Sequence, residues 1–280
     1  MRRNFAEVLQ SGNIDIKKEF SRLYTLFYNS EENNTYSWQS LYNCINNNFA
    51  RIPFRGTCLT LDDFNNEYDF KFNVDPEKIT IDLLVTFCEY LTNLASHSFN
   101  LPLFYYDLNS SDIQFLLEQI NMVIEKIGYT EAKNGDFTIY VIKDQAAMTV
   151  SEIVPQDLSY KIIEYNHHSL KGNIEAKKQT LLLLAKQFEA SKTKLKTINK
   201  SLENNISYGL NNLNIRHNNL DSSLPKNYKP ALTKMNKEKI ESLYDDLYQM
   251  LLLGFLELDN IERMEKFEKA KREIESTIGK

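Results

Sequence analysis

The sequence predicts a mainly α-helical protein of two domains with one small β-hairpin, and three observations support this prediction. Apolar residues recur at three- and four-residue steps along most of the chain, which is typical of amphipathic helices. Only 8 glycines and 6 prolines interrupt the 280 residues. The clearest alternating pattern, in residues 129–143, surrounds Asn134-Gly135, a dipeptide that favours a type I′ hairpin turn because both residues tolerate positive φ.

Residues 1–154 are predicted to form an amino-terminal, mostly helical domain that contains this hairpin. Apolar spacing indicates helices at residues 16–28, 38–49, 76–95 and 111–127. Ser37 stands where a side-chain oxygen caps the second helix, and Trp38 is expected in the core.

Residues 155–280 are predicted to form a carboxyl-terminal helical bundle that begins at Pro155. A short helix is expected over residues 157–164 and further helices over residues 237–277. Asp245-Asp246 is expected to face away from the buried stripe of the last helices. Residues 148–154, which come directly before Pro155, fit either a short strand or the start of a helix.

A seven-residue apolar repeat predicts one long helix from Asn173 to Leu202. The repeat consists of Ile174, Leu181, Phe188, Leu195 and Leu202, with Leu184 and Ile198 between them. Such a seam packs along a partner, which is either the rest of this domain or a second copy of the chain.

Composition excludes several classes of protein. The net charge of -5, from 33 basic and 38 acidic residues, does not suit a general polyanion receptor, although a local basic patch is compatible with RNA binding. Cys44, Cys58 and Cys88 lack metal or redox spacing, which indicates buried, reduced thiols. No signal peptide or run of roughly 20 apolar residues is present, so a cytoplasmic protein without membrane contact is expected. Phosphate-loop and Gly-x-Ser-x-Gly motifs are absent, which argues against an NTPase or a serine hydrolase. No cofactor is expected.

The string Asn211–Asn219 contains the candidate catalytic pair, Arg216 and His217, between Asn212 and Asn218. A guanidinium can neutralise a phosphate, and an imidazole can act as acid or base near neutral pH, so the pair suits RNA backbone cleavage. The alternative interpretation is that the asparagines cap helix ends while Arg216 pairs with an acid such as Asp221 or Asp245.

A second polar string, Tyr165–Asn173, contains His167, His168 and Lys171. Adjacent histidines rarely bind one metal, and no third ligand follows at a suitable spacing, so no metal site is expected. Backbone amides at Lys171-Gly172-Asn173 are candidates for binding an anion at a helix start. An unbroken helix from Asn173 to Leu202 would be about 45 Å long and would keep the two strings apart. A single composite site requires a break near Asn204-Asn205 or an antiparallel dimer.

Three strings and the predicted long helix together resemble the bacterial abortive-infection proteins of the AbiJ and Abi-like type. The strings are Tyr165–Asn173, Leu213–Asn219 and Leu243–Tyr248. The carboxyl-terminal domains of those proteins are similar to the HEPN superfamily. The resemblance covers about residues 155–280 and implies an all-α bundle, commonly a dimer, with metal-independent ribonuclease activity in phage defence or toxin systems.

The HEPN motif is an arginine, a polar residue, three to five further residues and a histidine. Arg216 matches the arginine and His217 the polar position, while Asp221, Ser222 and Ser223 occupy the span of the closing histidine. Three alternatives remain. His217 supplies the imidazole, a histidine of the Tyr165–Asn173 string supplies it across a dimer, or the domain binds RNA or a partner without cutting.

The sequence therefore predicts an antiviral or toxin-type HEPN-like protein that acts on RNA. Arg216 would hold phosphate and His217 would assist attack by the 2′-hydroxyl. Binding or supporting roles fall to Asn212, Asn218, His167, His168 and Lys171. The alternative function is a non-catalytic sensor or scaffold that assembles with itself or with a partner protein of a phage-defence system.

Overall fold

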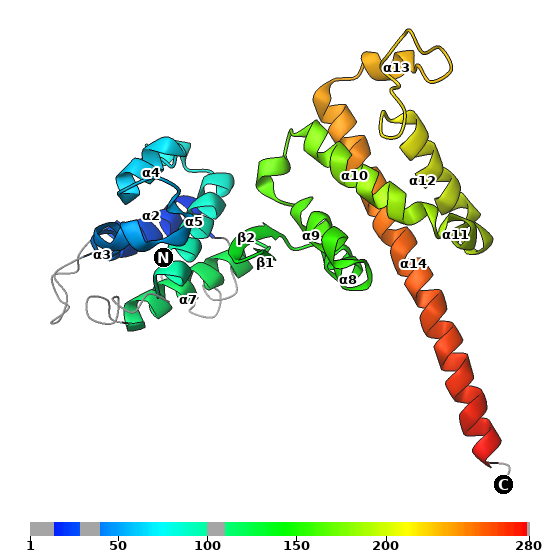
Figure 1. Ribbon diagram of the computed structural model, residues 1–280, viewed down its shortest axis with the longest axis horizontal. Helices are drawn as coiled ribbons and strands as arrows, with labels where there is room; N and C mark the ends of the chain where they lie inside the picture. Colours follow the sequence, from blue (N-terminus) through cyan, green and yellow to red (C-terminus); the bar gives the residue numbers. More distant parts are fainter. Residues whose placement is uncertain (1–13, 29–39, 100–109, 279–280) are drawn as a thin grey trace, which may run out of the picture. The chain divides into compact units, whose positions relative to one another are not determined.

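A computed structural model describes residues 14–28, 40–99 and 110–278 of the chain. The chain is mainly α-helical with one two-stranded antiparallel hairpin in this part, which confirms the predicted fold class (Figure 1). Ser37 and Trp38 lie outside the described residues.

The chain divides into two compact units, Met1–Tyr140 and Val141–Lys280. The division falls before α8 (Gln145–Ile153) because this helix packs against α9 and α14 of the second unit. This division precedes the predicted boundary at Pro155, which lies after α8.

The amino-terminal unit is built around α5, which packs against α2 and α7. Its helices are α2 (Ile16–Tyr28), α3 (Leu41–Asn48), η1 (Phe49–Arg51), η2 (Pro53–Arg55), α4 (Leu61–Glu67), η3 (Pro76–Lys78), α5 (Ile81–Phe99) and α7 (Ser110–Lys126). Ser40 caps α3 by accepting a 3.2 Å hydrogen bond from the Asn43 N–H. The three cysteines are buried, as expected.

The hairpin consists of β1 (Tyr129–Asn134) and β2 (Phe137–Ile142), close to the predicted residues. Its two-residue loop is Gly135-Asp136, with φ of 60° at Gly135. Among the described residues other than glycine, only Asp69 and Asn214 have positive φ. The expected type I′ turn on Asn134-Gly135 is therefore wrong, because Asn134 remains in the strand and only the glycine takes the left-handed conformation.

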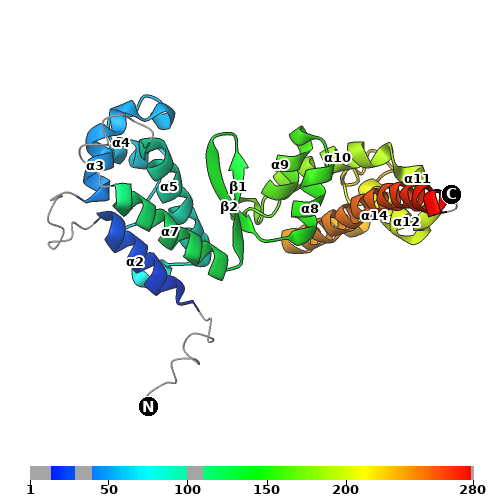
Figure 2. The same cartoon turned by 90° about the horizontal axis from the view of Figure 1, so that it is seen from below.

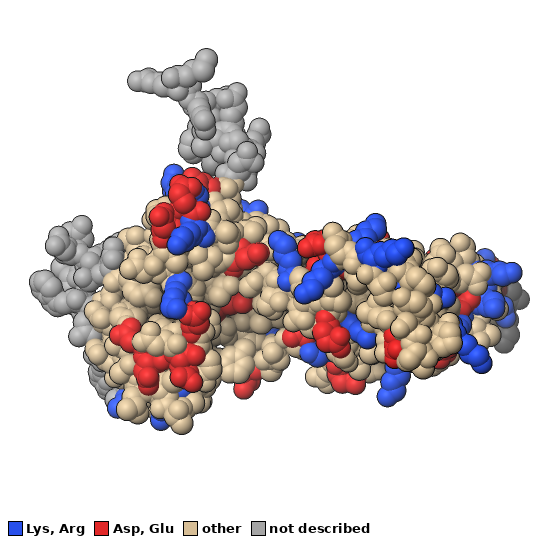
Figure 3. Space-filling model, turned by 90° about the horizontal axis from the view of Figure 1, so that it is seen from above, with Lys and Arg blue, Asp and Glu red and all other residues tan. Residues whose placement is uncertain are grey.

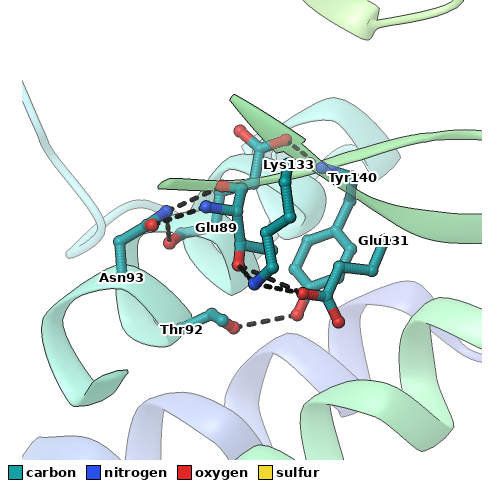
Figure 4. Close-up of polar contacts among 7 residues, drawn as sticks. Glu89, Thr92, Asn93, Glu131, Lys133 and Tyr140 are labelled. Carbon is teal, nitrogen blue, oxygen red and sulfur yellow. Dashed lines mark hydrogen bonds and ion pairs between the residues drawn. The ribbon is translucent and has the colours of Figure 1, made fainter. Parts of the chain in front are cut away.

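Side chains of α5 satisfy the backbone of β2 at its open edge (Figure 4). The Asn93 amide forms two hydrogen bonds with Thr138, accepting from its N–H and donating to its carbonyl, both at 2.8 Å. Glu89 accepts a 2.7 Å hydrogen bond from the Tyr140 N–H, and a 2.9 Å bond joins the Thr92 and Tyr140 hydroxyls. The helix thus acts as a neighbouring strand would and covers an otherwise exposed sheet edge.

The carboxyl-terminal unit is a helical bundle around the first half of α14 (Figure 1 and Figure 2). Its helices are α8 (Gln145–Ile153), α9 (Gln156–Glu164), η4 (His168–Leu170), α10 (Ile174–Glu189), α11 (Lys192–Ile198), α12 (Lys200–Asn212), α13 (Pro230–Thr233) and α14 (Lys237–Ile278). The stretch 148–154 is therefore helical, in α8. Helices α10, α11 and α12 all contact α14.

The single long helix predicted from Asn173 to Leu202 is wrong, because the chain breaks it into α10, α11 and α12. Asn199 leaves the helical conformation, with φ of -139°, and its side chain caps α12 by accepting from the Leu202 N–H at 3.0 Å. The repeat residues Leu181, Phe188, Leu195 and Leu202 are nevertheless buried in one core, whereas Ile198 is 49% exposed. The seven-residue repeat therefore marks residues that are buried in one core, but they lie on three successive helices and not on one.

Asn93 provides a test of the edge contact, because an alanine there leaves the Thr138 N–H and carbonyl without their partner. We expect Asn93→Ala to lower the free energy of unfolding by about 1–3 kcal/mol. The Thr138 amide should also exchange its hydrogen faster. Urea denaturation and hydrogen exchange measure the two effects, and Asn66→Ala, at an exposed position of α4, is the matched control. Equal stability of the two variants would contradict this role.

Candidate functional site

Arg216 lies in the loop after α12 and is held against the end of α10. Its guanidinium donates a 3.2 Å hydrogen bond to the Ala185 carbonyl and forms an ion pair with Glu189. The side chain is 22% exposed. Arg216 thus pairs with an acid, as one interpretation of the sequence expected, but the acid is Glu189 and neither Asp221 nor Asp245.

The neighbouring asparagines divide into structural and exposed ones. Asn214, with φ of 60°, and Asn219 bond each other's backbone N–H through their side-chain oxygens, at 3.1 and 2.7 Å. Asn219 is 1% exposed and also donates to the Asn227 carbonyl at 2.6 Å. Asn212 donates to the Tyr208 carbonyl at 2.8 Å. His217 and Asn218 are exposed, so only part of this string is available to a ligand.

The other string, at the start of α10, forms caps and turns. The Ser169 N–H donates to His167 Nδ1 at 3.2 Å and begins η4, and the His167 and His168 ring centres lie 4.3 Å apart. Asn173 caps α10 through the Ala176 N–H at 3.1 Å. Lys171 is exposed, but the adjacent Gly172 N–H already donates to Glu241 at 2.9 Å. This amide is therefore not open to an anion.

The break in the predicted long helix does not bring the two strings together. His168 precedes α10, whereas Arg216 contacts Ala185 and Glu189 at the end of that helix. A rise of 1.5 Å per residue separates these positions by roughly 20 Å. Within one chain the imidazoles of His167 and His168 and the guanidinium of Arg216 therefore belong to separate places.

A buried lysine, Lys177, is the centre of a polar cluster in this unit that the sequence patterns did not reveal. The Lys177 side chain is 8% exposed, and its ammonium lies 2.7 Å from Glu241 and 2.8 Å from Asp245. Tyr165 donates to Asp245 at 2.9 Å, and its ring stacks on Tyr248 at 3.9 Å between centres. The expectation that Asp245 faces away from the core is therefore wrong, because the carboxylate binds a lysine buried on α10.

The electrostatics of this Lys177 cluster follow from burial and pairing. Burial by itself would raise the pKa of Glu241, but hydrogen bonds from Lys177 and the Gly172 N–H outweigh it and lower that pKa. Burial, reinforced by Asp245, raises the pKa of Tyr165 well above its usual value, which keeps the phenol protonated as a donor.

One signal for this cluster was available in the sequence: Lys177 lies three residues after Ile174 and four before Leu181, on the apolar stripe.

The amino-terminal unit contains a cavity of about 300 Å³ between α5, the hairpin and the segment before α5. Its walls are mostly aromatic and aliphatic: Phe54, Phe64, Phe70, Tyr90, Leu94, Phe137 and Ile139. The polar groups beside it are engaged by the chain, since Asn93 binds Thr138 and the Tyr90 hydroxyl donates to Asn65 at 2.9 Å. Its walls therefore suit an apolar group, and the Glu89 carboxylate, which accepts from the Tyr140 N–H, is also among the lining residues.

No protein family, curated protein or solved structure matches this chain. Within the described residues, no helix combines the length and the apolar character needed to cross a membrane.

The Lys177 cluster yields a stability prediction. Lys177→Met leaves two facing carboxylates without their cation and should lower the free energy of unfolding at pH 7 by roughly 2–4 kcal/mol, less than for a fully buried pair because Asp245 is half exposed. Glu241, with an ordinary pKa of 4.5, has a lowered pKa when folded. Its contribution is thus present above that value and lost as the pH falls through the folded pKa.

Urea denaturation between pH 7 and pH 3 therefore gives a specific pattern. The stability difference between the wild type and Lys177→Met should shrink as the pH falls below about 4.5. Lys178→Met, which removes the neighbouring ammonium, is the control and should change stability by less than about 0.5 kcal/mol. A difference that stays constant with pH would refute the electrostatic origin.

Proposed function

We propose that the carboxyl-terminal unit binds RNA through its basic segment, residues 190–237, which comprises α11, α12, the following loop and α13. This segment contains nine lysines and arginines but only two acidic residues, in a chain whose net charge is -5. On the face drawn in Figure 3, acidic side chains gather on the amino-terminal unit, whereas Lys and Arg prevail toward the α11–α14 end of the other unit. Such local charge is the electrostatic footprint of a polyanion site.

Most of these cations are available to a ligand. Lys192 and Lys194 approach acidic side chains of the unit, at 3.6 to 3.8 Å, and Arg216 pairs with Glu189. The other six form no ion pair with any described residue: Lys196, Lys200, Lys226, Lys229, Lys234 and Lys237. Phosphate contacts by these lysines would not require an existing pair to break.

Helix α12 adds groups that can contact bases. Tyr208 is 68% exposed, and Asn204, one turn earlier on the same side of the helix, is also exposed. Aromatic side chains stack on unpaired bases whatever the sequence, and amides can bond base edges. An exposed tyrosine between groups of lysines therefore favours single-stranded RNA as the ligand.

A ribonuclease reaction is the second candidate, favoured by the exposure of His217 beside Arg216. Glu189 already neutralises Arg216, so its use as a phosphate ligand requires this ion pair to open. The phage-defence role implied by the resemblance of residues 155–280 fits either outcome, RNA capture or RNA cleavage. Binding is the function that the observed charges support most directly.

The binding proposal is tested by fluorescence anisotropy with a labelled single-stranded RNA. We expect the double variant Lys196→Glu/Lys200→Glu to weaken binding at least about tenfold and to flatten the salt dependence by roughly 0.7 in log-log slope per lost phosphate contact. Tyr208→Ala should weaken binding by about 1–3 kcal/mol without changing that slope. Lys266→Glu/Lys269→Glu, which makes the same charge change on exposed α14, is the control. No binding at low salt, or equal effects of the two charge reversals, would refute the proposal.

The same RNA distinguishes binding from cleavage when it is incubated in EDTA. Loss of cleavage in both Arg216→Ala and His217→Ala, with binding retained, would establish a metal-independent ribonuclease. Glu189→Gln releases the Arg216 guanidinium and should tighten RNA binding. If the RNA stays intact in every reaction, the ribonuclease candidate is excluded and RNA binding is the remaining function.

A further inference from the structure

The end of α14 is exposed at every described position after Glu262, which still forms an ion pair with Lys194 of α11, whereas Leu258 is buried in the core of the unit. Every residue from Glu262 to Ser276 is exposed, and in Figure 1 this part of the helix, drawn in red, extends past the other helices of the unit. Most helical stability in proteins comes from packing of an apolar face, and this end of α14 buries no such face in its own unit. Packing against another surface would therefore stabilise this segment.

Large apolar side chains form a stripe along this segment. Met264, Phe267 and Ile274 are 60%, 71% and 63% exposed. Their spacing of three and seven residues places them at positions a, d and d of a heptad, with Lys271 at the remaining a position. We call these four residues the α14 stripe. Met264 and Phe267 lie one turn apart on this face, and neighbouring exposed apolar side chains are a candidate interaction surface.

We propose that the α14 stripe pairs with the same stripe of a second copy as a parallel two-stranded coiled coil. An open hollow of about 290 Å³ is lined by Met264 and Phe267, with Arg263 on one side and Glu268 on the other. These flanking residues occupy positions g and e. In a parallel pair, a g residue faces the e residue five positions later in the partner, so Arg263 of each copy meets Glu268 of the other.

Charge selects the parallel orientation. An antiparallel pair would bring e positions together, which places Glu268 and Glu275 of one copy beside the same residues of the other and leaves Arg263 opposite uncharged g residues. Within one chain the Arg263 guanidinium lies 2.5 Å from the Asp259 carboxylate. In the dimer its remaining N–H groups would face Glu268 of the second copy. The polar Lys271 at a single a position sets the register at some cost in stability. This dimer is independent of the proposed RNA binding, since no stripe residue belongs to the basic segment.

Sedimentation equilibrium of the full chain tests the assembly. The wild type should be dimeric at micromolar concentration, and Phe267→Lys should raise the dissociation constant at least about a hundredfold by placing a second lysine pair in the seam. Phe267 contributes no core contact, so circular dichroism should show the fold retained. Lys269→Glu, on the opposite side of the helix, should leave the dissociation constant within about twofold.

A charge exchange tests the orientation. Arg263→Glu and Glu268→Lys each create like-charged g–e pairs in their own homodimers, and each should weaken association about tenfold. Mixing the two variants restores opposite charges on both sides only in a parallel heterodimer. Recovery of the dimer on mixing, measured by sedimentation, is the expected result.

Three outcomes would overturn the proposal. A wild type that remains monomeric excludes the coiled coil, and a dimer unaffected by Phe267→Lys places the contact elsewhere. Failure of the mixed variants to pair excludes the parallel order. If the monomer instead binds anionic lipid vesicles and Phe267→Lys abolishes that binding, the stripe serves a membrane surface and the dimer is refuted.

Discussion

The carboxyl-terminal unit depends on the buried ammonium of Lys177. A lone buried cation is strongly unfavourable, so the surrounding chain has to supply opposite charge and hydrogen bonds in one geometry. Glu241 and Asp245 do so from one side of α14, and Tyr165 completes the cluster from the end of α9. Shifting α10 along α14 by one turn would separate these groups. The cluster therefore specifies how the two helices align, and apolar packing around Tyr248 supplies much of the stability.

The need of buried polar groups for partners also shapes the amino-terminal unit, where the groups concerned belong to the backbone. A two-stranded hairpin leaves an open edge, and the backbone groups of β2 need partners there. Polar side chains of α5 meet this need, with Asn93 acting as a surrogate peptide unit for Thr138. Glu89 and Asn93 thus have structural partners in β2, beside a cavity with mostly apolar walls.

The distribution of basic side chains in the carboxyl-terminal unit bears on its proposed function. Pairing with Glu189 and the mutual bonds of Asn214 and Asn219 turn much of the Arg216 string into a folded loop. That loop follows α12, and five lysines of the basic segment remain exposed: Lys196, Lys200, Lys226, Lys234 and Lys237. The surface best suited to a polyanion is therefore broader than the Arg216-His217 pair, and the bare end of α14 lies outside it. Binding of RNA and association of two copies would use different parts of one unit.

The sequence by itself determined the fold class, the hairpin, and most of the helices with their buried faces, because hydrophobic period and turn residues act over a few neighbouring positions. It did not reveal that Asn199 interrupts the repeat from Ile174 to Leu202, since a cap and a surface asparagine look alike in a sequence. Only the tertiary structure decided the partners of Lys177 and Arg216. Asp245 lies 68 residues from Lys177, and Glu189 lies 27 from Arg216. Long-range pairing depends on how whole helices pack, and no local pattern encodes it.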